Sequence, residues 1–154
     1  MMGGGNQEMQ QMQQQLQQLE AEKEELNGEV EDLRDEKGEV DEAIEAVETL
    51  DTDSVVQVPL GGGAYLRASV EDIDEVIVEL GGGYAAERDQ EGAVASLKSR
   101  KDLLDEQIAD LQEEIGEVEA ESDQLEQKAQ QMQQQQMQQQ MQQMQQQQQD
   151  DEDE

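Results

Sequence analysis

Hydrophobic residues recur along two long stretches of the chain at alternating steps of three and four positions. The first stretch occupies residues 9–51 and the second occupies residues 90–132. A seven-residue repeat of this kind is typical of a left-handed coiled coil, in which heptad positions a and d form one narrow apolar seam. The only polar residues in the two series are Lys23, Lys37, Lys101 and Ser122, and all four fall on position a. The pattern therefore predicts two helices, each about 55–60 Å long at about 1.5 Å per residue.

Between these stretches, residues 52–89 change to short aliphatic runs separated by two glycine triplets, at 61–63 and 81–83. Glycine supplies the positive φ that a tight chain reversal requires, and Pro59 is acceptable near a strand end because it donates no ladder hydrogen bond. Neither triplet is followed by Lys-Ser or Lys-Thr, so no phosphate-binding loop is predicted. The segment is predicted to form two β-hairpins.

The predicted fold class is α+β, with a long antiparallel coiled-coil hairpin and two β-hairpins between its helices. Helices of matched length that are joined through a compact region are expected to fold back on each other, which brings the two chain ends together. Four short strands cannot bury a core alone and leave open edges. We therefore expect the β region to assemble with other subunits, through Val56, Val58, Leu60, Leu66, Val76, Val78, Leu80 and Tyr84.

The charges follow the same register. Among 154 residues, 41 are acidic and 9 are basic, which gives a net charge of −32. The basic residues within the helices all fall on positions a, e or g, where their stems cover apolar surface and their charged ends can meet carboxylates. The outer face is left acidic and polar. A surface of one sign repels itself unless salt screens it, so the sequence predicts a protein from a halophile.

The methionines gather near the two ends of the chain, at positions 1, 2, 9, 12, 132, 137, 141 and 144. In an antiparallel hairpin these clusters meet at the tip, and methionine-rich surfaces accept irregular apolar partners. We therefore predict a tip that binds exposed apolar segments of other proteins. The candidate client-binding residues are Met9, Met12, Leu16, Leu125, Met132, Met137, Met141 and Met144.

The same residues allow a second interpretation. Met9, Met12 and Met132 continue the heptads, so packing within the coiled coil explains them equally well. Residues 1–8 are predicted to form a flexible tail. Residues 133–154 are rich in glutamine and methionine and end in acidic residues; glutamine tracts make no packed core, so this tail is predicted to be disordered.

The residue types that are missing exclude several functions. Without Cys or His the chain has no disulfide, thiol nucleophile, zinc site or imidazole base. Two aromatic residues and few cations argue against nucleic-acid binding. No apolar run reaches the ~18 residues needed to cross a bilayer, and the start of the chain lacks the features of a signal peptide. We expect a soluble cytoplasmic protein that is not an enzyme, uses no cofactor or metal and contacts no membrane.

The β region and its flanking heptads together resemble the alpha class of the archaeal prefoldin family. The likeness extends over roughly residues 9–132 and is carried by Val58-Pro59-Leu60-Gly61, Val76-Ile77-Val78, Gly81-Gly82-Gly83-Tyr84 and Glu87-Arg88. The presence of two hairpins points to the alpha class. The long Gln/Met-rich ends and the extreme acidity depart from the family pattern.

The resemblance implies a hexamer of two alpha and four beta subunits, with a double β-barrel body and six projecting coiled coils. It implies an ATP-independent chaperone that holds non-native polypeptides with its coiled-coil tips and delivers them to a group II chaperonin. One alternative is a coiled-coil scaffold or adaptor without chaperone activity, which leaves the clustering of methionine unexplained. Another is an acidic histone chaperone or a chaperone that mimics nucleic acid, which uses the charge but leaves the hairpins unexplained.

Overall fold

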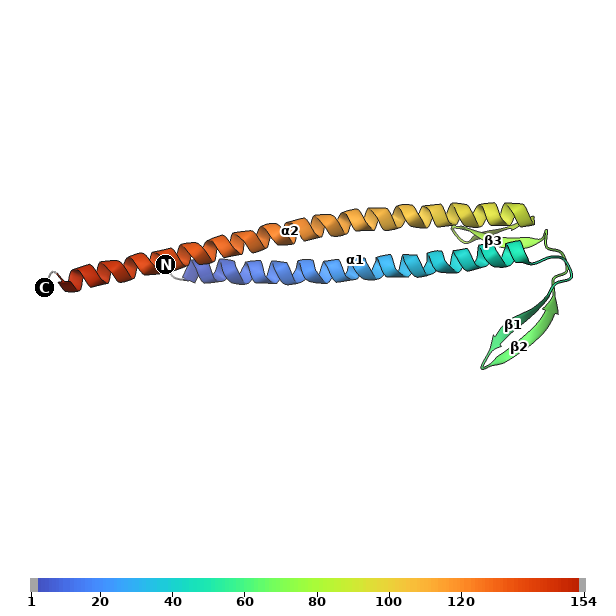
Figure 1. Ribbon diagram of the computed structural model, residues 1–154, viewed down its shortest axis with the longest axis horizontal. Helices are drawn as coiled ribbons and strands as arrows, with labels where there is room; N and C mark the ends of the chain where they lie inside the picture. The colour runs from blue at the N-terminus through green and yellow to red at the C-terminus, as the bar shows by residue number, and fades with distance from the viewer. Residues whose placement is uncertain (1–2, 153–154) are drawn as a thin grey trace. The chain divides into compact units, whose positions relative to one another are not determined.

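The computed structural model describes residues 3–152, which form two long helices and two β-hairpins (Figure 1). Helix α1 spans Gly3–Thr49 and helix α2 spans Gln90–Glu152. The strands between them are β1 (Val55–Gly61), β2 (Ala64–Ser69), β3 (Val76–Gly81) and β4 (Tyr84–Arg88). The predicted α+β class, with two antiparallel hairpins between two long helices, is confirmed.

The chain divides into two compact units. The terminal unit consists of residues 1–29 and 111–154, and the central unit consists of residues 30–110. Each unit contains a stretch of α1 and a stretch of α2, and the central unit also contains both hairpins.

The structure buries the positions that the heptad pattern assigns to the seam. Every a and d residue from Met12 to Val47 and from Val94 to Met132 is buried or half-buried, whereas the b and f positions are exposed. This one-sided burial explains why residues with good helix propensity form stable helices here, because helices in water depend mainly on packing an apolar face. The most deeply buried seam residues are Met12, Leu19, Val30, Val40, Val94, Leu104, Ile108 and Val118.

Ion pairs define the alignment of the two helices within each unit. In the central unit, Lys37 Nζ lies 2.6 Å from Asp105 Oδ1, and Lys101 Nζ lies 2.6 Å from Asp41 Oδ1. Residue numbers rise along one helix as they fall along the other, so the helices are antiparallel. In the terminal unit, Lys23 Nζ lies 3.0 Å from Glu119 Oε1. This pair has the same heptad positions as the pairs of the central unit.

The two hairpins have the same turn. Gly61 pairs with Ala64 across a two-residue turn, and Gly81 pairs with Tyr84 in the same way. All six glycines of the triplets have positive φ, between 61° and 96°, which residues with a Cβ adopt only with strain. Two consecutive turn residues with positive φ fit the type I′ turn that matches the twist of β-strands. A register irregularity precedes each turn, between Pro59 and Gly61 and between Glu79 and Gly81.

Within the central unit, the second hairpin lies along α2, and its inward face is covered there. Val78 is 6% exposed, and the neighbouring Val76 is half-buried. Leu80 lines a groove together with Leu103 and Leu104 of α2. Val78, which is predicted to contribute to a surface shared between subunits, is therefore covered within its own chain, and its part in assembly stays a prediction. The pattern of a single strand cannot reveal which face its own helix covers.

Hydrogen bonds join the helix ends to the β region. The side-chain amide of Gln90 donates to the carbonyl oxygens of Val47 and Leu50, at 2.8 and 3.0 Å. These carbonyls lie at the end of α1, where no further helical turn supplies a donor. At the start of α2, the Asp89 carboxylate accepts a 2.7 Å hydrogen bond from the amide of Gly92, as an N-cap residue does. The first residue of α2 thus closes the last turn of α1.

Both segments that are predicted to be flexible or disordered tails are helical over the residues that the structure describes. Helix α1 begins at Gly3, so residues 3–8 are helical, and α2 continues to Glu152, so residues 133–152 are helical as well. The remaining parts of the predicted tails, residues 1–2 and 153–154, lie outside the described residues. The prediction of disorder relied on composition. Gln, Met and Glu all have good helix propensity, and a long uninterrupted run of them extends a helix that is already formed.

Candidate interaction surfaces

The predicted tip residues fall into two structural groups within the terminal unit. Met12 is buried, and Met9, Leu16, Leu125 and Met132 are half-buried. All five occupy a or d positions, so they face the partner helix. These five residues form the end of the coiled-coil seam, and they offer little free apolar surface in this conformation.

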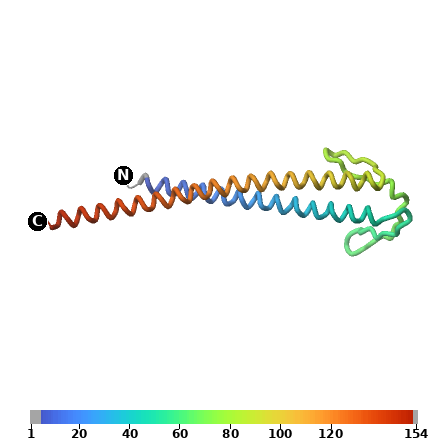
Figure 2. The backbone as a smooth tube through the Cα atoms, turned by 45° about the horizontal axis from the view of Figure 1, so that its top comes forward, coloured from blue at the N-terminus to red at the C-terminus, as the bar shows by residue number. Residues whose placement is uncertain are grey.

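The second group is exposed on α2. Met137, Met141 and Met144 have exposed fractions of 67%, 69% and 69%. A Cβ added to Gly5 would lie 2.6 Å from Nε2 of Gln136, so the first turn of α1 lies beside residue 136. Figure 2 shows that α2 continues beyond this start, as a single helix. We call residues 137–152 the overhang, and every one of its side chains is exposed.

The three methionines of the overhang form a stripe along one side of the helix. Their spacing of four and then three residues keeps them on one face, and the stripe is about 10 Å long at about 1.5 Å per residue. Met137 lies five positions after Met132, so it is rotated by roughly 140° around the helix axis from Met132 at 3.6 residues per turn. The methionine stripe therefore does not continue the seam, and an α1 helix that was merely longer would not cover it.

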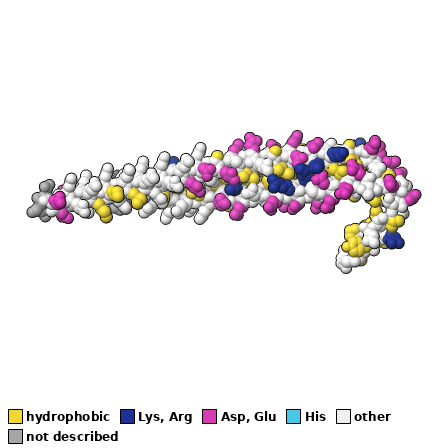
Figure 3. Space-filling view, viewed as in Figure 1, with side chains coloured by type: hydrophobic (Ala, Val, Ile, Leu, Met, Phe, Trp, Pro, Cys, Tyr) yellow, Lys and Arg dark blue, Asp and Glu magenta, His cyan; other side chains and the backbone are white. Residues whose placement is uncertain are grey.

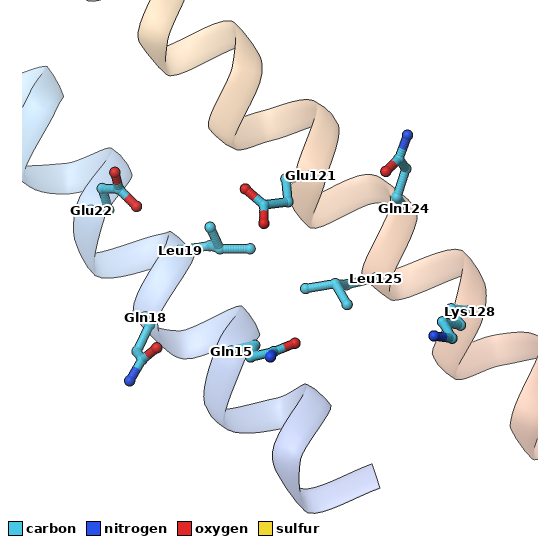
Figure 4. A pocket seen from close by; sticks show the side chains of 8 residues that line it. All are labelled: Gln15, Gln18, Leu19, Glu22, Glu121, Gln124, Leu125 and Lys128. Atoms are coloured by element: carbon cyan, nitrogen blue, oxygen red, sulfur yellow. The ribbon is translucent and has the colours of Figure 1, made fainter. Parts of the chain in front are cut away.

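A groove follows the seam of the terminal unit, between α1 and α2. Leu19 and Leu125 point toward each other at its floor, and polar side chains form its rims (Figure 4). Leu19 is buried, whereas Leu125 is half-buried. The a position at this level is Ser122, whose small polar side chain adds little apolar packing to the seam. The residues that line the groove are Gln15, Gln18, Leu19, Glu22, Glu121, Gln124, Leu125 and Lys128.

The hairpins carry the second set of predicted interaction residues. Five of the eight are exposed by 41–77%, namely Val58, Leu60, Leu66, Leu80 and Tyr84. Val56 and Val76 are half-buried and Val78 is buried. Val56 lies beside Ala46 and Leu50 of α1, with which it lines an apolar hollow. The exposed apolar surface is therefore concentrated on the first hairpin and on the turns.

Three further exposed apolar residues, which are not among the predicted assembly residues, lie on the opposite strand faces. Val55, Tyr65 and Ile77 are exposed by 63%, 65% and 75%. Each hairpin is a separate two-stranded sheet, so both of its faces can take part in contacts. The signal for them in the sequence is that apolar residues stand on both faces of these strands.

Two ion pairs at the seam raise the pKa of the lysine that forms them. A hydrogen bond to Glu119, together with the charge of that carboxylate, raises the pKa of Lys23 above its usual 10.5. A hydrogen bond to Asp41 likewise raises the pKa of Lys101. Over the acidic part of the helix pair, basic side chains lie along the middle and acidic side chains lie at both margins (Figure 3). The predicted sorting of charges around the seam is thus visible on the surface.

Residues 3–152 contain no group of three or more His, Cys, Asp or Glu side chains arranged to hold a metal ion. Within the same residues, neither helix has an apolar stretch long enough to cross a membrane. Exposed apolar side chains lie on the methionine stripe and on the hairpins, and the seam groove adds a part-apolar hollow between the helices.

The chain is a coiled-coil protein that carries two β-hairpins between its helices, with exposed apolar side chains on both elements. The family model described as "Prefoldin subunit" matches residues 12–135. This match covers most of the chain, and the chain belongs to the prefoldin family.

Similar proteins agree with this assignment. "Prefoldin subunit alpha" of Halorubrum lacusprofundi is 59% identical over 113 residues, which cover 73% of this chain and 74% of that protein. "Prefoldin subunit alpha" of Haloarcula marismortui is 67% identical over 66 residues, which cover 43% of each chain, so the match spans less than half of that relative. The resemblance to archaeal prefoldin alpha subunits, and to those of halophilic archaea in particular, is confirmed.

The fold agrees as well. A cryo-EM structure of filamentous PFD from Methanocaldococcus jannaschii has a TM-score of 0.50 to this chain and 26% sequence identity. The superposition covers 76% of this chain and 93% of the other. The two long helices with hairpins between them are therefore an arrangement that a solved prefoldin shares.

Proposed function

We propose that this chain is the alpha-type subunit of a cytoplasmic prefoldin that holds non-native polypeptides without ATP and delivers them to a group II chaperonin. The observation that carries this proposal is the methionine stripe, Met137, Met141 and Met144, which is more than two-thirds exposed on a helix segment without a partner helix. Membership in a chaperone family and the alpha-subunit names of the relatives support it.

The chemistry of the stripe suits weak and general binding of apolar segments. Thioether side chains are flexible and polarizable, so they adapt to apolar groups of different shape. The surrounding glutamines keep the surface hydrated without adding charge that would select one partner. One stripe of about 10 Å binds weakly, but several arms in one assembly raise the overall affinity while each contact still releases quickly.

The hairpins provide the assembly surface in this proposal. Val58, Leu60, Leu66, Leu80 and Tyr84 pair with beta subunits in a hexamer of two alpha and four beta chains, where the strands contribute to β-barrels shared between subunits. Val55, Tyr65 and Ile77 join them on the other strand faces. The support is their exposure, because apolar patches of this kind on a soluble protein mark interaction sites.

The client-binding role is tested by replacing the three methionines with glutamine (Met137→Gln, Met141→Gln and Met144→Gln). Glutamine has a helix propensity close to that of methionine, so the helix is retained while the apolar surface is lost. The hexamer reconstituted with beta subunits should then lose most of its ability to prevent aggregation of a denatured client. The matched control replaces the same residues with leucine and should keep the activity. Full activity of the glutamine variant would contradict the proposal and favour the scaffold interpretation.

The assembly role has its own experiment. Leu60→Ser together with Tyr84→Ser should prevent association with beta subunits, measured by native mass spectrometry. The control is Met141→Gln, which should leave the mass of the complex unchanged because it lies on the overhang. A hexamer that forms normally with the serine variant would show that the turns do not take part in assembly.

A further inference from the structure

Three lysines occupy position a of the seam, where apolar residues are the rule. Lys23, Lys37 and Lys101 are each about one-third exposed, and each lies within 3.0 Å of a carboxylate of the other helix. Polar residues at position a usually weaken a coiled coil and serve to specify its alignment. The three lysines therefore require an account beyond stability.

The carboxylates that meet these lysines share one heptad position. Glu119, Asp105 and Asp41 each follow directly after a d residue, so all three stand at position e of the opposite helix. Two basic residues also occupy position e, Arg34 on α1 and Lys98 on α2. The same alignment places Arg34 alongside the a residue Ile108 and places Lys98 alongside the a residue Ile44. Acidic residues thus stand opposite the seam lysines, and the e-position cations stand opposite apolar residues.

A shift of the helices by one heptad in one direction destroys this match. It would place Lys37 opposite Lys98, Lys101 opposite Arg34, and Lys23 opposite the neutral Gln112. All three ion pairs would be lost, and two close contacts between like charges would form. Like charges at neighbouring positions destabilise a helix pair and act as a specificity device.

A shift by one heptad in the other direction is tolerated better. Lys23 would meet Glu126 and Lys101 would meet Glu48, whereas Lys37 would face Gln112. The apolar seam itself does not distinguish the alignments, because a heptad shift brings a residues opposite d residues again. Among these three alignments, only the observed one gives each of the three lysines a carboxylate partner.

We propose that the three seam lysines and their carboxylate partners select the heptad register of the helix pair, and so set how far α2 extends past α1. One heptad corresponds to about 10 Å along the helix axis. The tolerated shift would slide the start of α1 over the part of α2 that carries Met137. The ion pairs therefore determine how much of the overhang is free, whether or not the overhang binds clients.

The register can be measured with pairs of cysteines because the chain has none of its own. Ile115→Cys is combined with Leu19→Cys, Leu26→Cys or Leu33→Cys, three d positions of α1 spaced by one heptad. Leu26 lies opposite Ile115 in the observed register, and Leu19 and Leu33 lie opposite it in the two shifted ones. Dibromobimane, a short cross-linker that fluoresces when it joins two thiols, reports which pair is opposed. With the native charges, only the pair at positions 26 and 115 should react.

Neutralising the three acidic partners should move the register in a chosen direction. In the triple variant Asp41→Asn, Asp105→Asn and Glu119→Gln, the bimane fluorescence of the cysteine pair at 33 and 115 should rise at least several-fold. The reason is that Glu126 and Glu48 still offer partners to two of the lysines. Adding Glu48→Gln and Glu126→Gln should remove that gain. On the neutralised background, Arg34→Glu with Lys98→Glu should instead raise the signal of the pair at 19 and 115.

Circular dichroism on every variant establishes that the helices are intact. If the neutralised variant stays helical and reacts only at 26 and 115, the proposal is wrong. In that case the register is set by the ion pair between Arg100 and Glu36, by the bonds from Gln90 to the end of α1, or by apolar packing. A shift toward the pair at 19 and 115 in the neutralised variant without the glutamate replacements would overturn it as well.

Discussion

The two parts of helix α2 have similar helix propensity but different surroundings. Residues 90–132 carry the heptads, have α1 as a partner and bury Leu104, Ile108 and Val118 to exposed fractions of 5–9%. Residues 133–152 carry glutamine and three exposed methionines, and the first turn of α1 lies beside Gln136. The first part is held by a buried seam, whereas the second is held only by its continuity with the first. This difference teaches that in one helix the seam supplies stability and the overhang supplies free surface.

The charges differ between the two parts in the same way. Acidic residues cover the outer face of residues 90–132, but residues 129–149 contain no charged residue at all. The energetic effect of salt is therefore expected in residues 90–132, together with the stretch of α1 that pairs with them, which we call the paired part. The neutral overhang should lose its helix at low salt only because that helix continues from the paired part.

The largest expected effect follows from removing salt. At 1 M salt the Debye length is about 3 Å, and at 0.01 M it is about 30 Å, so the acidic face repels itself at low salt. Dialysis from molar potassium chloride into dilute buffer should remove most of the helical circular dichroism. The matched variant Glu24→Gln, Glu31→Gln and Glu117→Gln, at outer positions of the paired part, should unfold at a lower salt concentration. Helical signal that is independent of salt in both proteins would contradict this view.

The second largest effect is expected from single side-chain truncations, which compare the stability contributed by the two parts of α2. Leu104→Ala removes a side chain that is 5% exposed and should lower the free energy of unfolding by about 2–3 kcal/mol. Met141→Ala removes an exposed side chain and should change it by less than about 0.5 kcal/mol. Thermal or urea unfolding at constant molar salt measures both. A comparable loss in the two variants would show that the overhang is packed against something in solution.

Much of the paired part could be predicted from the sequence, because heptad position and burial are both consequences of helix geometry. Met12 and Val118 were placed on the seam by spacing alone, and they are buried there. The glycine triplets likewise predicted the turns, since consecutive positive φ values leave few alternatives to glycine.

The overhang and the hairpin faces could not be predicted in this way. For residues 133–152, composition favoured disorder while propensity favoured a helix, and no local pattern decides between them. Val78 and Val58 occupy equivalent places in two similar hairpins, yet they are 6% and 41% exposed. The difference arises because α2 covers one hairpin, and contacts between distant segments leave no trace in the pattern of a single strand.

The smallest expected effect concerns the seam lysines of the paired helices. The pKa values of Lys23 and Lys101 are raised above 10.5 by their carboxylate partners, so in the unfolded chain these lysines lose their protons first. The stabilisation from the two pairs is therefore fully present below about pH 10.5 and is lost as the pH rises through the higher pKa values of the folded chain. Thermal unfolding between pH 8 and 11.5 in molar salt should show a decrease in melting temperature that begins above about pH 10. Lys23→Leu with Lys101→Leu keeps the seam apolar and removes both titrating groups, so its melting temperature should fall less over this interval. The same dependence on pH in both proteins would show that the ion pairs of Lys23 and Lys101 contribute nothing measurable to the stability of the paired part.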